Sequence, residues 1–534
     1  MPLTPRLRSG PFRPGKPLDP RTLGGVRRGL TVVLVAFAVL VALRLDETPV
    51  GSLTDDAFYV AMARSLAAGH GPVVQAGPDA PAANPGLFPP GYPLMLAPLA
   101  FAQPHGLDLL KLVGVLASLA FVGLAWRLGR DDDSTHSVLI LACVALNPWT
   151  VAWAGRITSD VPYAAIALAA LLLGRGLVDG RAPSPRRYAA VVILAGLAML
   201  TRTIGLAVLL AIVATLLGHR RWARAGVVLV GTAATQLVLL LPGWSAGVLW
   251  LGDGYRAQVL AHHAGPGARA AFMAHNLVGY AKELPVLMVP MFGRALDARL
   301  GAVAVWLQAA VAVALLALVA IGAVRRHRDA PDDATSPLLL WYAGFTLLAL
   351  ANFDGWPSGV QTRLLLPLLP ALWWWALRGA PGAGVRAGLV IVALVACLGH
   401  NAWRVARPLE ETSARAGHGF VDPGDGAAWI AANTAPGDVL MAQEPLARHV
   451  RLDHPVIALG EPGSNAPDLA QMEARAARYG ARWLLLAPAL EGTPRRLDAT
   501  GARWKALLSG AGRTPAWEDP ALAISVYRVH AGAE

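Results

Sequence analysis

Two adjacent carboxylates, Asp55 and Asp56, stand shortly after the first apolar run of the chain. They open the stretch 55–64, whose pattern is typical of an amphipathic helix. Carboxylates held close to a membrane are costly unless they bind a charged group or take part in chemistry. The alternative is a helix cap, because aspartates are favoured in the first turn of a helix.

Other polar residues of interest stand at or near the ends of apolar runs: Arg64, Arg156, Asp160, Arg202, Asp354, Gln361 and Arg363. Arginines can hold a phosphate through charge-assisted and often bidentate hydrogen bonds. Carboxylates can bind a cation or an attacking hydroxyl group. If these side chains converge, they predict a site where a phosphate leaves and a hydroxyl attacks.

Several of these residues also have a purely structural explanation. Arg202 can extend its side chain to the lipid headgroups, and Arg363 can anchor its segment at the membrane interface. Arg156 and Asp160 are four residues apart and can pair with each other at a helix end. The residues alone leave these alternatives open.

The composition indicates which elements must position these side chains. Of the 534 residues, 55% are hydrophobic and only 15% are charged, whereas a soluble domain carries about a quarter charged residues. Long apolar runs recur along the chain, which predicts an α-helical polytopic membrane protein. Much of the net charge of +12 lies in short Arg-rich loops, which is a signal of membrane topology and not of nucleic-acid binding.

The apolar runs predict about 11 transmembrane helices. A cytoplasmic Arg/Pro-rich tail, residues 1–28, precedes a transmembrane domain, residues 29–403, whose first outer loop covers residues 46–108. The stretch 188–217 has basic loops on both sides, so we expect a hairpin with Arg202 at its outer turn. This topology places the N-terminus in the cytoplasm and the polar residues above on the outer face of a prokaryotic inner or plasma membrane.

Residues 404–534 differ in character from the rest of the chain. A helix ends near residues 474–480, a short buried strand follows at 482–487, and 521–529 has the pattern of a final strand. Alternating strands and helices predict a small α/β domain. An odd number of spans places this domain outside the cytoplasm.

Three further features favour structural roles. The aromatic run Trp373–Trp375 is typical of an interfacial belt near the cytoplasmic end of its span. Cys143 and Cys397 lie inside apolar runs, which favours packed free thiols. His262 and His263 have no acidic partner at ligand spacing, which favours a solvated loop over a metal site.

Five short motifs follow one another along residues 29–400. They are Asp55–Tyr59 (Asp-Asp-Ala-Phe-Tyr), Phe88–Pro93 (Phe-Pro-Pro-Gly-Tyr-Pro), Ser159–Tyr163 (Ser-Asp-Val-Pro-Tyr), Leu200–Thr203 (Leu-Thr-Arg-Thr) and Gln361–Pro367 (Gln-Thr-Arg-Leu-Leu-Leu-Pro). In order and spacing they resemble the motifs of the GT-C glycosyltransferases, which include protein O-mannosyltransferases and lipid A aminoarabinose transferases. The positions that depart from the family pattern are Asp160 for Glu, Thr203 for Pro and Leu364 for Tyr.

The resemblance implies an activity and roles for the carboxylates. Such enzymes transfer a sugar from a polyprenyl-phosphate donor to an acceptor hydroxyl on the outer face, usually with inversion. By this resemblance Asp55 takes the proton of the acceptor hydroxyl. Asp56 would position the acceptor or tune Asp55, since adjacent carboxylates can separate their pKa values. Asp160 would help to bind the acceptor or the sugar.

The resemblance also implies the phosphate contacts and the partners. Arg202, Arg363 and Arg156 would hold the donor phosphate. The remaining substrate positions are Tyr59, Tyr92 and Gln361. The partners implied are the polyprenyl-phosphate-sugar donor, a lipid, glycan or protein acceptor, and membrane lipids, without nucleic acid. No metal ligand is assigned, and dependence on a divalent metal, Mg²⁺ or Mn²⁺, stays open.

Three other functions compete with this one. A transporter or flippase of lipids or lipid-linked glycans would also use charges facing a membrane cavity, although transporters usually bind near the membrane midplane and often contain internal repeats. A non-catalytic envelope scaffold would not need the polar cluster. A different lipid-linked enzyme, such as an O-antigen-type ligase or polymerase, differs only in its product.

Overall fold

The computed structural model describes residues 20–45, 50, 55–79, 88–104, 106–130, 134–178, 182–237, 266–290, 302–331, 333–352, 362–406, 424–435, 437–459, 468–488, 497, 499–520 and 523–529. Up to residue 406 this part is mainly helical. The α-helices there are α1 (Pro20–Arg44), α2 (Asp55–Ala67), α3 (Gly91–Ala102), α4 (Leu107–Gly129), α5 (Ser134–Ala145), α6 (Pro148–Ala154), α7 (Asp160–Gly174), α8 (Pro185–Thr201), α9 (Leu206–Gly218), α10 (Trp222–Thr235), α12 (Pro266–Met288), α14 (Ala302–Asp329), α15 (Thr335–Ala351), α16 (Leu369–Gly379) and α17 (Gly382–Val405). Short 3-10 turns are η1 (Arg175–Leu177), η2 (Thr203–Gly205) and η4 (Thr362–Leu368).

Several helix starts are encoded locally. The side chains of Asn147 and Ser184 accept hydrogen bonds from the backbone N–H groups of Trp149 and Arg187, and a proline follows each capping residue. A polar cap followed by proline favours a helix start, because proline needs no N–H partner there. α2 begins at Asp55, as the amphipathic pattern predicted.

Five described helices are long and apolar enough to cross a membrane: Gly24–Arg44 in α1, α4, Asp160–Leu177, Ala309–Asp329 in α14, and α17. The pair α5 and α6 is bent by 59° and makes a sixth span if counted as one. α3, α15 and Thr203–Gly218 are shorter apolar helices. The protein is thus mostly helical with several apolar helices, as expected, while the number of about 11 spans stays a prediction.

The predicted hairpin at Arg202 is present. Arg202 ends α8 in an extended conformation, with φ −149° and ψ 141°. A Cβ on Gly231 of α10 would touch Val192 of α8, and one on Gly196 of α8 would touch Thr235 of α10. From residue 192 to 196 along α8, the partner on α10 moves from residue 231 to 235, so the two helices are parallel. α9 connects them and runs in the opposite direction. The chain therefore reverses at Arg202.

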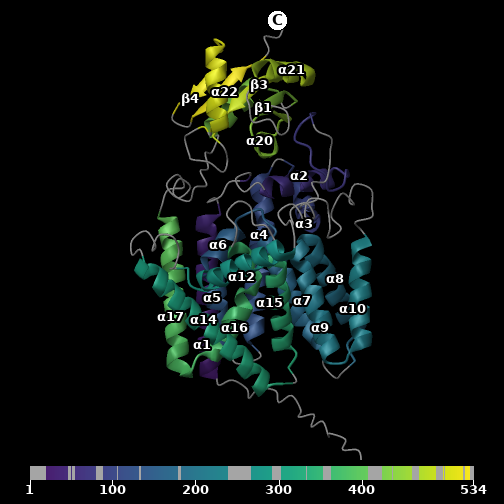
Figure 1. Cartoon of the computed structure of the whole chain (residues 1–534), viewed down its shortest axis with the longest axis vertical. Helices are drawn as coiled ribbons and strands as arrows, with labels where there is room; N and C mark the ends of the chain where they lie inside the picture. Colours follow the sequence, from purple (N-terminus) through teal and green to yellow (C-terminus); the bar gives the residue numbers. More distant parts are fainter. Residues whose placement is uncertain are drawn as a thin grey trace, which may run out of the picture.

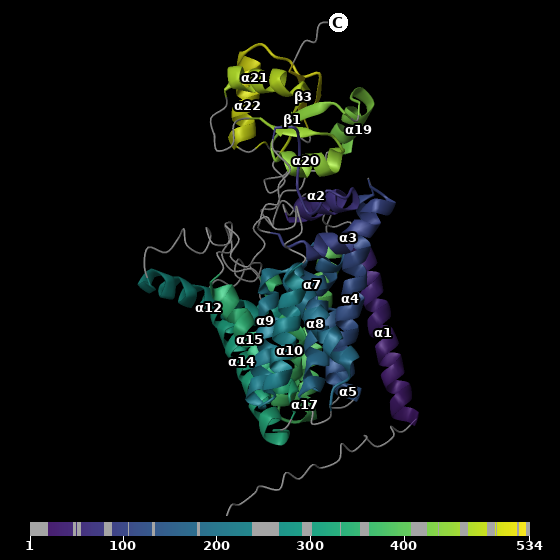
Figure 2. The ribbon, with the colours of Figure 1, turned by 90° about the vertical axis from the view of Figure 1, so that its right-hand side faces the viewer.

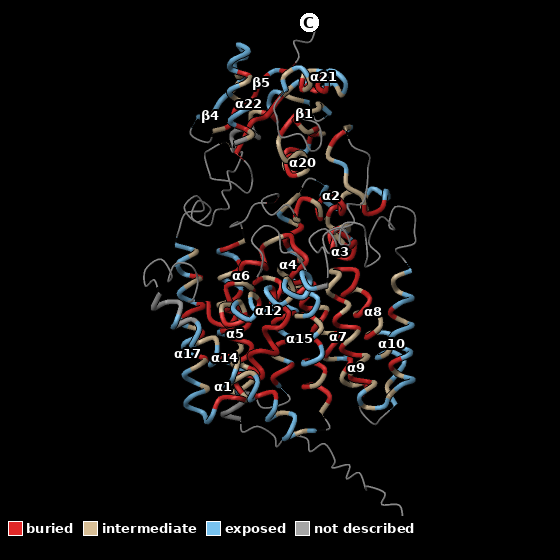
Figure 3. The backbone as a smooth tube through the Cα atoms, in the orientation of Figure 1, coloured by how far each residue is buried: buried red, intermediate tan, exposed pale blue. Residues whose placement is uncertain are grey.

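Figures 1 and 2 show the long helices side by side in a bundle, with α2 and α3 at one end and the C-terminal strands beyond them. Figure 3 shows the buried residues concentrated on the inward faces of these helices, while α10 and α17 expose their outer faces. Outward apolar residues such as Val230 and Val395 are 69% and 62% exposed. An apolar outer surface on a bundle of apolar helices is what a lipid environment requires.

The C-terminal part contains α19 (Gly424–Asn433), β1 (Val439–Ala442), α20 (Pro445–Leu452), β2 (Val456–Ala458), α21 (Leu469–Tyr479), β3 (Ala481–Leu486), α22 (Ala499–Gly510), β4 (Trp517–Asp519) and β5 (Ile524–Arg528). The strands form one sheet in the order β2-β1-β3-β5-β4, parallel from β2 to β3 and antiparallel at β5 and β4. Side chains alternate across it: Met441 packs with α21 and α22, whereas Leu440 packs with α19 and α20. Helices therefore cover both faces of this sheet.

Trp373–Trp375 do not form an interfacial belt. All three side chains are at most 2% exposed and belong to the main core of the bundle. α14 packs closely against α16, so that a Cβ on Gly322 would meet the carbonyl oxygen of Trp375. The prediction is wrong because neighbouring helices cover α16 on all sides that these rings face. Cys143 and Cys397 are buried and free, as predicted.

Candidate active site

Most of the predicted site residues meet at the end of the bundle that lies next to α2 and α3. The start of α2, the start of α7, the end of α8 and η4 each contribute a charged side chain. These segments are far apart in the chain, and the contacts of α7 with α8 and η4 bring them together.

The first contact joins Asp55 to Arg363. Nη2 of Arg363 in η4 donates a hydrogen bond to Oδ2 of Asp55, the first residue of α2, at 3.1 Å. The Asp55 side chain is 27% exposed and that of Arg363 is 18% exposed. A carboxylate and a guanidinium are therefore held together where a substrate can still reach them.

The second contact joins Asp160 to Arg202. Nη1 of Arg202 donates to Oδ1 of Asp160 at 2.7 Å and lies 3.2 Å from the hydroxyl of Ser159. The Ser159 hydroxyl is also 2.9 Å from the hydroxyl of Tyr59 on α2. Oδ2 of Asp160 is buried and has no hydrogen-bond partner among the described residues. This network connects α2 to α7 and α8.

Trp153, at the end of α6, gathers two of the arginines. The guanidinium carbon of Arg156 lies over its ring at 4.4 Å, and that of Arg363 at 5.4 Å. Cation–π contacts of this kind hold guanidinium groups in place. The sequence also allowed Arg156 to pair with Asp160 at a helix end. That part of the alternative is wrong, because Asp160 pairs with Arg202. Trp153 was not predicted from the sequence as a site residue, although its place three residues before Arg156 was a signal.

Asp56 occupies a different position from Asp55. Its side chain is buried, and Oδ1 accepts a hydrogen bond from the backbone N–H of Ala57 at 2.8 Å. This bond satisfies a donor at the start of α2, which agrees with the helix-cap alternative for this residue. The two adjacent carboxylates therefore have different environments: Asp55 pairs with Arg363, and Asp56 accepts a backbone hydrogen bond.

The motif Phe88–Pro93 packs beneath α2. The rings of Phe88 and Tyr92 both meet the ring of Tyr59 edge-on, with centroids 5.4 Å and 5.0 Å away. Tyr92 is fully buried, and its hydroxyl has no hydrogen-bond partner among the residues that the structure describes. A Cβ at Gly91 would lie 2.6 Å from the backbone carbonyl of Leu200, so only glycine allows α3 to start against the end of α8.

The surroundings change the pKa of Asp55. Burial raises the pKa of this carboxyl above its ordinary value, and Arg363 opposes the rise. The negative charge of Asp160 raises the pKa further, while Arg202 lowers it. Asp56 was expected to position the acceptor or to tune Asp55; a carboxylate that raises the pKa of Asp55 is that of Asp160. A carboxyl group with a raised pKa is a better proton acceptor near neutral pH.

Not all polar residues at the span ends join this cluster. Arg64 faces the C-terminal part of the chain, where its Nη1 lies 3.7 Å from Asp453 and 3.4 Å from the carbonyl oxygen of Val450. Gln361 and Asp354 lie outside the described residues, as do His262 and His263.

One carboxylate near the cluster was not identified from the sequence. Glu283 on α12 accepts a hydrogen bond from the hydroxyl of Thr362, the residue before Arg363. Its only signal in the sequence was its place directly before the apolar residues 284–292. Among the described residues, no group of three or more His, Cys, Asp or Glu side chains is arranged to hold a metal ion, and metal dependence stays open.

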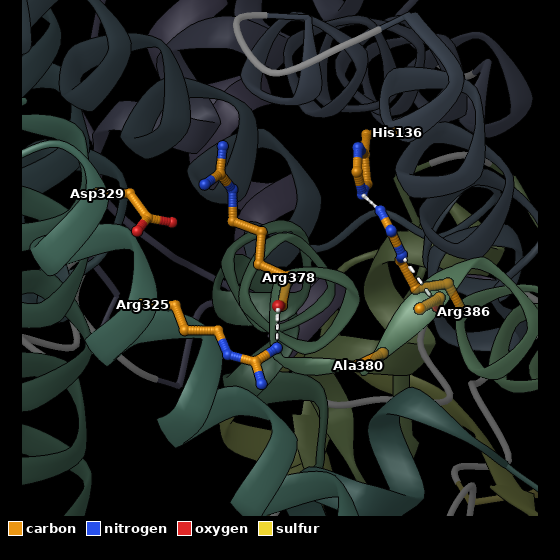
Figure 4. Close-up of a pocket in the computed structure, with 7 residues that line it drawn as sticks. His136, Arg325, Asp329, Arg378, Ala380 and Arg386 are labelled. Atoms are coloured by element: carbon orange, nitrogen blue, oxygen red, sulfur yellow. Dashed lines mark hydrogen bonds between the residues drawn. The ribbon is translucent and has the colours of Figure 1, made fainter.

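The opposite end of the bundle is basic. A cavity of about 370 Å³ there is lined by His136, Arg325, Asp329, Arg378, Ala380, Gly382 and Arg386. Figure 4 shows Arg325 bonded to the backbone carbonyl of Arg378, and Arg386 to His136. None of the predicted site residues lines this cavity, so the two polar regions are separate.

Comparisons with known proteins concern the family and the fold of the chain. Residues 89–245 match the family model described as dolichyl-phosphate-mannose-protein mannosyltransferase. No curated protein sequence matches the chain significantly. The chain is similar in structure to ArnT from Cupriavidus metallidurans bound to undecaprenyl phosphate, with a TM-score of 0.61, 15% identity, and coverage of 95% of this chain and 98% of that one.

ArnT from the same organism in the apo state gives a TM-score of 0.58 at 16% identity, covering 96% of this chain and 99% of that one. At these identities the likeness concerns the fold. Together with the family match, it confirms the resemblance that the motifs indicated: the chain has the fold of the GT-C superfamily of membrane glycosyltransferases.

Proposed function

We propose that this protein transfers a sugar from a polyprenyl-phosphate donor to an acceptor hydroxyl at the outer face of a membrane, with inversion at the sugar carbon. The observation that carries the proposal is the meeting of two Asp–Arg pairs, Asp55–Arg363 and Asp160–Arg202, at one end of the helix bundle. The solved relative is bound to undecaprenyl phosphate, which supports a donor of the same lipid class.

The distribution of arginines supports the outer face as the location. The Arg-rich helix ends, including Arg187, Arg224, Arg325 and Arg386, lie at the end of the bundle away from Asp55. Cytoplasmic loops of membrane proteins carry an excess of Arg and Lys. The site, α2 and the C-terminal sheet then face the outside.

In this proposal Asp55 is the general base. The acceptor hydroxyl oxygen attacks the sugar C1 from the face opposite the phosphate, while the carboxylate of Asp55 takes the hydroxyl proton. The bond from C1 to the phosphate oxygen breaks, and its electron pair leaves with the lipid phosphate. Attack from the opposite face inverts the configuration at C1. The raised pKa of Asp55 supports this role, because it strengthens the base.

The arginines would stabilise the leaving group. A sugar phosphodiester carries one negative charge, and the released lipid monophosphate carries nearly two, so cations gain contact energy as the bond breaks. A guanidinium has five N–H donors and can serve a carboxylate and a phosphate at once. Arg202 and Arg363 fit this role through their ion pairs, and Arg156 through Trp153, which it shares with Arg363.

The other polar groups would bind the substrates. Asp160 orients Arg202 and offers its buried Oδ2 atom to a hydroxyl of the sugar or the acceptor. Tyr92 offers a buried hydroxyl nearby, and Tyr59 connects α2 to Ser159. Asp56 holds the start of α2, which positions Asp55. Gln361 remains a predicted substrate contact.

The test is a transfer assay with the full-length protein in lipid. It would supply radiolabelled polyprenyl-phosphate mannose, glucose and pentose donors together with extracted envelope acceptors. We expect wild type to transfer label and Asp55→Asn to be slower by about 10²–10⁴-fold, as for loss of a general base. The anomeric configuration of the product tests inversion directly.

The matched control is Asp108→Asn. Asp108 is also an aspartate at the outer end of the bundle, but its side chain is 86% exposed and pairs with Lys111 on α4. This variant should transfer label at the wild-type rate. Equal rates for wild type and folded Asp55→Asn would refute Asp55 as the base. If no variant consumes any donor, while lipid-linked sugar crosses the bilayer, the transferase proposal fails in favour of a flippase.

A further inference from the structure

The segment that follows α2 lies along the edge of the C-terminal sheet. The backbone N–H of Val456, in the edge strand β2, donates to the carbonyl oxygen of Ala76 at 2.8 Å. Residues of the first outer loop therefore continue the sheet beyond β2. An edge strand offers unpaired backbone groups, and this contact satisfies one of them.

A glycine makes this approach close. At Gly77 a Cβ would lie 2.4 Å from the backbone carbonyl oxygen of Val456. Any other residue would push the loop away from the sheet edge. The contact therefore depends on the local sequence on both sides.

A buried ion pair closes the contact. Nη2 of Arg475 on α21 donates to Oδ2 of Asp79 at 2.8 Å, and the backbone N–H of Ala458 donates to the same oxygen at 3.2 Å. The Arg475 and Asp79 side chains are only 9% and 12% exposed. Ion pairs in such surroundings are sensitive to loss of either partner, because the remaining charge stays desolvated.

The C-terminal part also contacts α2 directly. Ala447 and Val450 of α20 belong to one buried apolar cluster with Tyr59, Val60 and Tyr92, separate from the two clusters within the C-terminal sheet. Arg64, in the last turn of α2, reaches the C-terminal end of α20 at Val450 and Asp453. Figures 1 and 2 show α20 next to α2 in both views.

We infer that the C-terminal domain is a positioning element of the active site, which holds α2 through the Asp79–Arg475 pair and the α20 contact. The inference rests on the proposed role of Asp55. α2 packs on α3 along its length. Its first turns also contact η4 and α7, at Asp55 and Tyr59, and its last turn and the loop beyond contact the C-terminal domain. Release of the second anchor lets α2 tilt about the first, which changes the position of Asp55 relative to Arg363.

The expected size of the effect follows from the geometry of catalysis. A displacement of about 1 Å at a catalytic group costs roughly 10²-fold in rate. Substrate affinity depends mainly on arginines of the bundle and changes less. The variants should therefore lower kcat more than they raise the KM for the donor.

The test uses the full-length protein with Arg475→Ala, the milder Asp79→Asn, and the charge exchange Asp79→Arg with Arg475→Asp. The control is Arg513→Ala, which breaks an exposed ion pair with Glu473 in the same domain. Hydrogen exchange of residues 55–79 and of the C-terminal sheet is measured beside kcat and KM for transfer.

We expect Arg475→Ala and Asp79→Asn to lower kcat by about 10- to 100-fold with a KM for the donor within about threefold of wild type. Exchange at residues 55–79 should rise while the sheet stays protected, the charge exchange should restore part of kcat, and Arg513→Ala should match wild type. Wild-type exchange at residues 55–79 in both single variants would overturn the inference. So would a loss of kcat that the charge exchange does not restore and that accompanies faster exchange throughout the sheet. Hydrogen exchange can be measured even if the protein has no transferase activity. A failure of the proposed function would therefore be distinguished from a failure of this inference.

Discussion

Asp160 and Arg202 form an ion pair of 2.7 Å between the first residue of α7 and the residue that ends α8. Asp160 is only 3% exposed, and Arg202 replaces the contact with water that its side chain loses. Ser159 extends the pair to Tyr59 on α2. The turn of the α8–α9 hairpin is thereby fixed against the helix that carries the proposed base.

Stability should show how strongly this pair is coupled. Arg202→Gln leaves a buried carboxylate unpaired and should lower the free energy of unfolding by about 3 kcal/mol. Adding Asp160→Asn removes that carboxylate, so the double variant should lose less than the sum of the single losses. The measurement is thermal unfolding of all three variants in lipid nanodiscs.

The control for this cycle is Lys505→Gln, which breaks an exposed pair with Glu518. An exposed pair contributes only about 0–1 kcal/mol, so this variant should unfold close to wild type. Additive losses at Asp160 and Arg202 would show that the two side chains are not coupled.

The pH dependence of transfer should report on Asp55. Its pKa is raised by burial and lowered by Arg363. A base works when deprotonated, so the acid limb of kcat/KM should lie above the ordinary aspartate value of about 3.9. Arg363→Gln removes a positive charge, so the acid limb of its residual activity should move to higher pH. Asp160→Asn removes a negative charge, so the acid limb of its residual activity should move to lower pH.

The measurement is a kcat/KM profile from acidic to alkaline pH. Shifts in the same direction for both variants would contradict the electrostatic account. The raised pKa also has a consequence for folding. The contribution of Asp55 to stability is greatest below the unfolded-state pKa and is lost as the pH rises through the folded-state pKa.

Removal of one hydroxyl should loosen α2 slightly. Tyr59→Phe deletes the 2.9 Å contact with Ser159 and keeps the ring that packs against Tyr92. The expected loss of stability is about 1 kcal/mol, with a decrease of several-fold in kcat. Tyr188→Phe, at the opposite end of α8, is the control and should leave kcat unchanged. A rate for Tyr59→Phe equal to wild type would mean that Ser159 does not position α2.

The close contact between α3 and α8 predicts a glycine requirement. Gly91→Ala would place a Cβ 2.6 Å from the carbonyl of Leu200, two residues before Arg202. We expect a loss of about 1–3 kcal/mol in stability from overpacking, with reduced transfer because Arg202 moves. Gly123→Ala on α4 meets no atom within 4 Å and should be neutral or slightly stabilising. Equal melting temperatures for the two variants would rule out the tight approach.

Much of the architecture was readable from the sequence. Apolar runs predicted a helical membrane protein, and basic loops on both sides of residues 188–217 predicted the reversal at Arg202, because charge bias between loops depends only on the order of residues along the chain. Motif order pointed to the GT-C fold. Asp55, Asp160, Arg202 and Arg363 were all identified as members of one site, because polar residues at the ends of apolar runs need a reason to be there.

The pairing of these residues was decided by the tertiary structure. Spacing allowed Asp160 to pair with Arg156, yet it pairs with Arg202, and its carboxylate also raises the pKa of Asp55. Electrostatic interactions depend on distance and burial in space, which sequence separation does not report. The same holds for Trp373–Trp375, whose apolar character was evident but whose burial by α14 was not. Composition determines which side chains must leave water, and only packing determines what covers them.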